Sequence, residues 1–131
     1  MTGVLFDRRE FVGFSAVALL AACTTTTEGT EAMKELYGIV GQMKAAPGKR
    51  AELIGYLMEG TQAMPGNLAY IIAEDLADPD SIWITEVWRS KDDHAASLSL
   101  PSVQKAIAKG RPLIAGFGTR VETRPLGMGT V

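Results

Sequence analysis

From residue 36 onward, the hydrophobic residues follow two spacings, one typical of strands and one typical of helices. The run from Leu36 to Lys44, LYGIVGQMK, is rich in apolar residues that partly alternate, so it predicts a strand. The stretch after it contains Pro47, which suits the first turn of a helix, and ends at Pro65-Gly66. Within that stretch, the apolar residues at helical spacing are Leu53, Ile54, Leu57 and Met58. A strand followed by an amphipathic helix is therefore expected.

Three further strands are predicted from β-branched and aromatic residues. Leu68 to Asp75 and Ser81 to Arg89 are two such runs, and the LADPD between them is typical of a turn, so we expect a hairpin. Near the end of the chain, TRVETR alternates as a strand does, after Gly116 and Gly118.

A second helical region separates the hairpin from the last strand. Ser90 stands three residues before Asp93, a spacing typical of a helix start at which the serine side chain caps the backbone. Pro101 interrupts the region, and Ser102 can cap a restart through VQKAIAKG. The resulting order, β-α-β-β-α-β, predicts an α+β, ferredoxin-like fold with a four-stranded antiparallel sheet and helices on one face.

The second face of this sheet also needs a cover. Alternation along the hairpin places Ile82, Ile84, Glu86 and Trp88 on one face, and Trp83, Thr85, Val87 and Arg89 on the other. Neither set is polar throughout, so we expect a second sheet, most simply from a second copy of the chain, to cover the open face.

The first 35 residues have a different pattern. Arg8-Arg9 precede an apolar run, Val12 to Ala22, that is shorter than the ~20 residues needed to span a bilayer, which is typical of an export signal. The arginines resemble a twin-arginine motif or, alternatively, a generic basic front for the Sec route. Leu20 to Cys23 resembles a lipobox, in which Cys23 would carry the lipid; the alternative is a small residue in a cleaved signal.

This pattern divides the chain into three parts. We predict a signal peptide over 1–23, a polar tether over 24–35 and a folded domain over 36–131. A lipid on Cys23 would anchor the domain to a bacterial membrane, on its periplasmic or extracellular side.

Composition limits the possible functions. The net charge is −2 and no long basic run is present, which makes nucleic acid an unsuitable partner. The single cysteine cannot form an internal disulfide, and one cysteine with one histidine gives no metal-ligand spacing, so we predict no metal site.

Four stretches of the folded part resemble the antibiotic biosynthesis monooxygenase family: PGKRAEL, MPGNLAYIIAED, DPDSIWITEVWRSKDDHAASLSLPSVQKAI and PLIAG. The resemblance extends from about Leu36 to Val121 and is nearer to the branch described as quinol monooxygenases. It implies a dimeric α/β barrel that oxidises a quinol-like or polyphenolic small molecule with O2, without metal or flavin. In such a barrel we expect the face with Glu86 and Trp88 to line the interior and Trp83 to pack under the helices. Some relatives carry an asparagine on the first strand, where this chain has only the amide of Gln42, and this departure disfavours the haem-degrading branch.

The candidate catalytic residues lie close together in EVWRSKDDH, and each has a structural alternative. His94 is the natural general base, because it titrates near neutral pH; alternatively, it is a solvated residue at a helix start. Trp88 could stack on the substrate ring or be a core tryptophan. Glu86 could orient His94 or bind a substrate hydroxyl, or it could form an ion pair with Arg120 or Arg124. We expect Glu86, Trp88 and His94 to border one cavity.

Two residues near the start of the second strand are candidates for substrate binding. Tyr70 can donate a hydrogen bond to an oxyanion or act as a cross-strand aromatic, and Asn67 can bind substrate or serve as a turn residue.

The leading hypothesis, which the family resemblance implies, is a cofactor-independent monooxygenase. The alternative is a non-enzymatic lipoprotein that binds a small apolar ligand in the same barrel.

Overall fold

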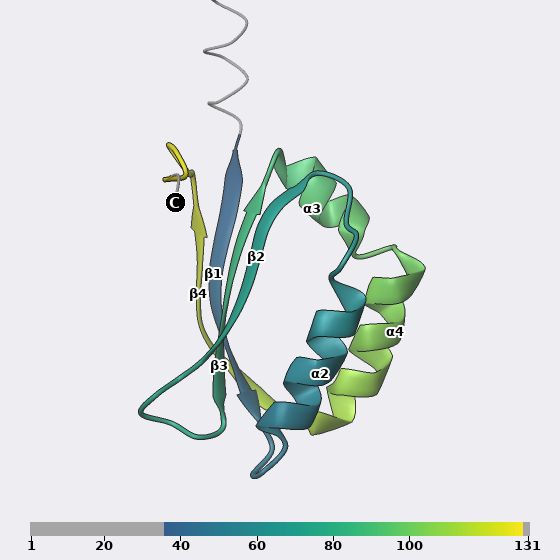
Figure 1. Cartoon of the computed structure of the whole chain (residues 1–131), viewed down its shortest axis with the longest axis vertical. Helices are drawn as coiled ribbons and strands as arrows, with labels where there is room; N and C mark the ends of the chain where they lie inside the picture. The colour runs from purple at the N-terminus through teal and green to yellow at the C-terminus, as the bar shows by residue number, and fades with distance from the viewer. Residues whose placement is uncertain (1–35, 130–131) are drawn as a thin grey trace, which may run out of the picture. The chain divides into compact units, whose positions relative to one another are not determined.

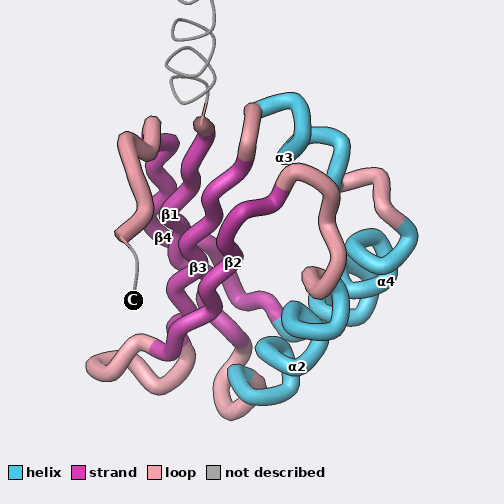
Figure 2. Tube along the Cα trace, turned by 45° about the horizontal axis from the view of Figure 1, so that its top comes forward, coloured by secondary structure: helices cyan, strands magenta, loops and turns pink. Residues whose placement is uncertain are grey.

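The computed structural model describes residues 36–129, which form two layers: one antiparallel sheet and a layer of helices that covers one of its faces (Figure 1; Figure 2). The elements in chain order are β1 (Tyr37–Ala45), α2 (Arg50–Gly60), β2 (Asn67–Glu74), β3 (Ser81–Trp88), α3 (Lys91–Ser97), α4 (Pro101–Gly110), the 3-10 turn η2 (Arg111–Leu113) and β4 (Ile114–Thr123). The sheet order is β2-β3-β1-β4, and every neighbouring pair is antiparallel. The predicted α+β, ferredoxin-like fold is confirmed. The predicted export signal, Cys23 and the tether lie outside the described residues.

The helix boundaries differ from the prediction at two prolines. Pro47 lies in the turn before α2, which begins at Arg50, so its predicted place in the first helical turn is wrong. The second helical region is divided into α3 and α4, and Pro101 is the first residue of α4, where its missing N–H costs nothing. Ser102 therefore does not cap the restart: the N-cap is Leu100, without a side-chain hydrogen bond. No helix in the described part of the chain is long and apolar enough to cross a membrane.

The core between sheet and helices determines which way each strand faces. Ile82 and Ile84 of β3 are buried with Leu53 of α2, and Trp88 is buried with Val103 of α4. The face of β3 that carries Glu86 and Trp88 therefore lies under the helices. The prediction that it lines the interior of a barrel is wrong, and so is the placement of Trp83 under the helices. Both faces are apolar, so strand alternation alone could not distinguish them.

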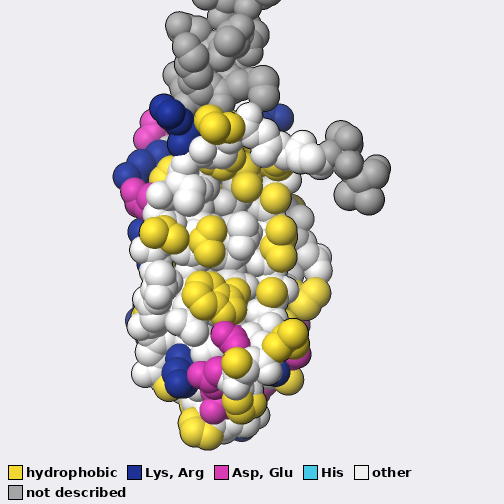
Figure 3. Space-filling view, turned by 90° about the vertical axis from the view of Figure 1, so that its left-hand side faces the viewer, with side chains coloured by type: hydrophobic (Ala, Val, Ile, Leu, Met, Phe, Trp, Pro, Cys, Tyr) yellow, Lys and Arg dark blue, Asp and Glu magenta, His cyan; other side chains and the backbone are white. Residues whose placement is uncertain are grey.

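The opposite face of the sheet carries many apolar side chains and few charged ones across its middle (Figure 3). Ile71 is 56% exposed on β2, and Val121 is 49% exposed on β4. An apolar sheet face of this kind is typical of a surface that another molecule covers. The predicted homodimer remains a prediction.

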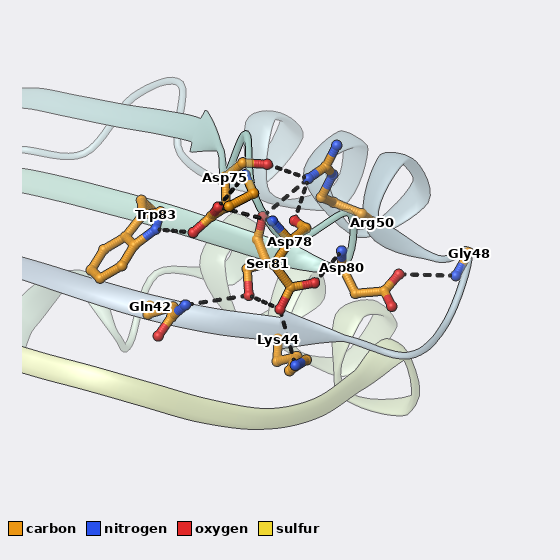
Figure 4. A network of polar contacts seen from close by, with 10 residues as sticks. Gln42, Lys44, Gly48, Arg50, Asp75, Asp78, Asp80, Ser81 and Trp83 are labelled. Carbon is orange, nitrogen blue, oxygen red and sulfur yellow. Dashed lines mark hydrogen bonds and ion pairs between the residues drawn. The ribbon is translucent and has the colours of Figure 1, made fainter.

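At one end of the sheet, a polar network fastens the β2–β3 loop to α2 (Figure 4). Arg50 Nη1 donates to the carbonyl oxygens of Asp75 and Asp78, at 3.1 and 3.0 Å. The Asp75 carboxylate accepts from Trp83 Nε1 at 2.8 Å, and this hydrogen bond is the main reason that its pKa is lowered. Arg50 thereby donates to two loop carbonyls, one of which, that of Asp78, also accepts from the backbone N–H of Ser81 at 3.2 Å.

Candidate active site

Glu86 is the centre of the candidate site. It lies on β3, on the face under the helices, and its side chain is 14% exposed. Its Oε2 accepts a hydrogen bond from Trp88 Nε1 at 2.8 Å and lies 3.8 Å from His94 Nε2. A carboxylate in such a sheltered position needs a donor, and the indole of Trp88 supplies one.

His94 reaches Glu86 because α3 begins directly after β3. The Ser90 hydroxyl accepts from the backbone N–H of Asp93 at 3.1 Å, so the predicted cap is confirmed. The imidazole packs against two aromatic rings, edge-on to Trp88 at 5.4 Å and tilted against Tyr37 at 5.6 Å between centroids. His94 is only 18% exposed, so it is not the solvated histidine of the alternative interpretation.

A cavity of about 250 Å³ opens beside the carboxylate of Glu86. Its walls come from β1, β2, β3 and β4, and its apolar lining includes Ile39 and Ile84. Among the described residues of its lining, the groups that can ionise are Tyr70, Glu86 and Arg120. We call this space the polar cavity; it lies on the side of the sheet that faces the helices.

Of the residues predicted to border one cavity, only Glu86 lines the polar cavity. His94 and Trp88 contact the Glu86 carboxylate but are not among the residues that line the polar cavity. Trp88 is 1% exposed, so its indole has no free face on which a substrate could stack. Trp88 is therefore a core tryptophan, as the structural alternative predicted, and its hydrogen bond also orients Glu86.

Tyr70 lies directly opposite Glu86 on the neighbouring strand β2. Burial raises the pKa of Tyr70 well above its ordinary value, and the negative charge of Glu86 adds to the shift. The phenol therefore stays protonated through the neutral range and can donate a hydrogen bond into the polar cavity.

The side chain of Asn67 has a structural position. Its Nδ2 donates to the carbonyls of Ala69 at 3.0 Å and Val87 at 3.3 Å, where the β2–β3 register shifts. Both N–H groups of the amide are thereby used by the backbone. Asn67 is the first residue of β2 and not a turn residue, and the structure gives substrate binding by Asn67 no support.

Arg120 was considered from the sequence only as an ion-pair partner for Glu86, and the structure gives it a different place. Its Nη1 lies 3.4 Å from Glu122 Oε1, while the nitrogen that lies near the Glu86 carboxylate is His94 Nε2, at 3.8 Å. Arg120 lies opposite Gly41 and lines the polar cavity with Glu86. The alternation of TRVETR could have indicated that Arg120 and Glu122 share a face.

Glu122 links several groups near His94. Tyr37 donates to Glu122 Oε1 at 2.7 Å, and Lys91 Nζ lies 3.4 Å from Glu122 Oε2. Burial, followed by the bond to Glu122, raises the pKa of Tyr37, and the same bond is the main cause of the lowered pKa of Glu122. The cluster fixes the ring of Tyr37 against His94.

Within residues 36–129, no group of three or more His, Cys, Asp or Glu side chains is arranged to hold a metal ion. The charged groups of the site are instead engaged with one another and with aromatic side chains. The arrangement can bind a polar, flat molecule and accept a proton from it.

Comparisons with known proteins agree with this fold. The family model of the antibiotic biosynthesis monooxygenases matches residues 36–109. A crystal structure from Chloroflexus aurantiacus J-10-fl, described as a candidate member of that family, is 56% identical, with a TM-score of 0.72, and the match covers 73% of this chain and 98% of that one. No match was found among curated proteins.

More distant structures show the same fold. A candidate antibiotic biosynthesis monooxygenase from Caulobacter crescentus CB15 has 19% identity and a TM-score of 0.65, over 72% of this chain and 93% of that chain. One from Bacteroides thetaiotaomicron VPI-5482 has 16% identity and a TM-score of 0.66, over 76% and 97%. The family match and the Chloroflexus relative together show that this chain belongs to the antibiotic biosynthesis monooxygenase family.

Proposed function

We propose that this protein is a cofactor-independent monooxygenase that oxidises a quinol-like small molecule with O2. The observation that carries the proposal is the carboxylate of Glu86 in the wall of the polar cavity, whose lining is otherwise mostly apolar. Trp88 donates a hydrogen bond to this carboxylate, and His94 lies next to it. A general base beside a pocket for a flat ring is what quinol chemistry requires. Membership of the family supports the oxygenase class.

The substrate itself can supply all four electrons that reduce O2. A hydroquinone and one O2 give a hydroxyquinone and one water: one oxygen atom forms a new bond to ring carbon, and the other leaves as water. The O–O bond and one ring C–H bond are broken. Oxidation of the quinol to the quinone supplies two electrons and hydroxylation of the ring carbon supplies the other two, so no external reductant is needed. The protein has to remove a phenolic proton, because the quinolate passes an electron to O2 far more readily than the quinol.

The residues divide this work in the proposal. Glu86 accepts the phenolic proton at the cavity wall and passes it to the imidazole of His94, which lies on the side of Glu86 away from the cavity. The 3.8 Å separation between them is long for a hydrogen bond and would shorten when substrate is bound. Tyr70 donates to a substrate oxygen, and the positive charge of Arg120 favours the anionic ring.

Oxygen uptake by the purified protein with several hydroquinones tests this proposal, measured against autoxidation in buffer. We expect Glu86→Gln to lower the rate about 10²–10⁴-fold, because it keeps the shape but removes the base. We expect His94→Ala to lower it as well. Glu74→Gln is the matched control, since Glu74 is a strand carboxylate that is 56% exposed and does not line the polar cavity.

An uptake rate no higher than autoxidation for every quinol would overturn the enzyme proposal. Binding of quinones without turnover would then favour the ligand-binding lipoprotein. Full activity in His94→Ala would remove His94 from the mechanism.

Assembly and location form part of the proposal. We propose that the apolar sheet face with Ile71 and Val121 pairs with a second copy of the chain. A monomer in sedimentation at micromolar concentration would contradict this. We also propose a lipid anchor on Cys23; release of the Cys23→Ser protein from the membrane fraction is the expected result.

A further inference from the structure

A second cavity, of about 590 Å³, lies between the helices and the sheet. We call it the apolar cavity. Its lining includes Leu53 and Leu57 of α2, Ile107 of α4 and Ile114 of β4. Among the described residues, Arg111 is the single charged one in this lining. Its size falls within the range of ~300–1,000 Å³ that is typical of small-molecule sites, whereas the polar cavity is below that range.

The two cavities adjoin each other. Met43 of β1 and Phe117 of β4 line both of them, and these two residues are register partners on neighbouring strands. Phe117 is 73% exposed, so close packing does not hold its ring in place. Methionine is the most adaptable apolar side chain. The boundary between the cavities therefore consists of two side chains that can move aside for a ligand.

From this arrangement we infer that the substrate is an amphiphile: an aromatic head carrying hydroxyl groups, with an apolar alkyl or isoprenoid tail. The head occupies the polar cavity beside Glu86, and the tail passes Met43 and Phe117 into the apolar cavity. This inference rests on the proposed function and specifies its substrate class. A ring alone would leave the larger, apolar space without a ligand, whereas a tail buries apolar surface there.

The experiment compares a tailless hydroquinone with a 2-alkyl hydroquinone whose tail has roughly ten carbons. Each methylene buried in the apolar cavity strengthens binding about fourfold, so three of them contribute about sixtyfold. We expect kcat/KM of the tailed quinol to exceed that of the tailless one by at least about tenfold, mainly through KM.

A cavity-filling variant locates the tail. Ile107 is 37% exposed, so Ile107→Trp can fill space without disrupting the core, and Leu57→Trp provides a second test from α2. Met58→Trp is the matched control: Met58 belongs to the same helix as Leu57, is 58% exposed and does not line the apolar cavity. We expect Ile107→Trp to lower kcat/KM of the tailed quinol toward that of the tailless one, and Met58→Trp to leave the ratio between the two as it is in the wild type.

Calorimetric binding of the corresponding quinones, with and without the tail, separates this inference from the proposed function. If no quinol is oxidised but the tailed quinone binds more tightly and Ile107→Trp weakens it, the enzyme proposal fails and the ligand class stands. If quinols are oxidised without any preference for a tail, the inference is overturned and the enzyme proposal stands. A preference that persists in both Ile107→Trp and Leu57→Trp overturns the placement of the tail.

Discussion

Replacing Trp88 with phenylalanine tests the claim that a buried indole N–H holds the carboxylate of Glu86. Trp88 is 1% exposed and donates to Glu86 at 2.8 Å. A hydrogen bond to a charged group contributes about 1.5–3 kcal/mol. Truncation of a buried tryptophan to alanine costs about 3–5 kcal/mol, and phenylalanine keeps most of the ring volume, so about 1 kcal/mol of packing is lost. We expect Trp88→Phe to lower the free energy of unfolding by about 2.5–4 kcal/mol.

Trp83→Phe is a matched control on the same strand. Trp83 also donates to a carboxylate at 2.8 Å, that of Asp75, but it lies half-buried on the open sheet face. Water can replace the lost bond there, so we expect a cost of only about 0.5–1.5 kcal/mol. Urea denaturation followed by far-UV circular dichroism measures both variants without relying on tryptophan fluorescence.

Several protein concentrations are needed, because assembly through the open face would shift the apparent stability. A cost for Trp83→Phe that grows with concentration would support pairing of that face. A cost below about 1 kcal/mol for Trp88→Phe would refute the reasoning about Glu86, since neither the charged hydrogen bond nor the packing would then contribute as calculated.

Three further changes test other parts of the structure. Ser90→Ala removes the cap that accepts from Asp93 and should lower the unfolding free energy by about 1 kcal/mol in urea denaturation; an unchanged midpoint would show that the cap contributes nothing. Gly66→Ala should cost more than about 1 kcal/mol by the same measurement, because Gly66 has φ +81° and a Cβ there would collide with the side chain of Asp93; wild-type stability would contradict both the strain and the contact. Asp78 has its pKa lowered to about 2, chiefly by the backbone N–H of Asp80. Its stabilising effect is therefore present above about pH 4 and lost as the pH falls toward 2, and thermal melts of Asp78→Asn should show a smaller loss of stability over that interval than wild type.

The local features of the site could be predicted from the sequence. The spacing of Ser90 and Asp93 indicated the cap that brings His94 to the end of β3, and alternation placed Glu86 and Trp88 on one face. These features depend on residues close together in the chain, where backbone geometry leaves few choices. The β-α-β-β-α-β order is likewise a property of local periodicity.

Other features required the packing of distant segments. Helix boundaries at Pro47 and Pro101 were misplaced, because a proline suits both a turn and a helix start. Arg120 joins Glu86 in the polar cavity only because β4 pairs with β1, a contact between residues far apart in sequence. The apolar cavity lies between α2, α4, β1 and β4, so no single segment indicates it.

The sequence by itself therefore determined the elements, their order and the grouping of Glu86 with Trp88. Only the tertiary structure decided which way that group faces. Both faces of β3 are apolar enough to be buried, so alternation leaves two equivalent assignments. The contacts of Ile82 with Leu53 and of Trp88 with Val103 select one of them, and with it they place the site under the helices.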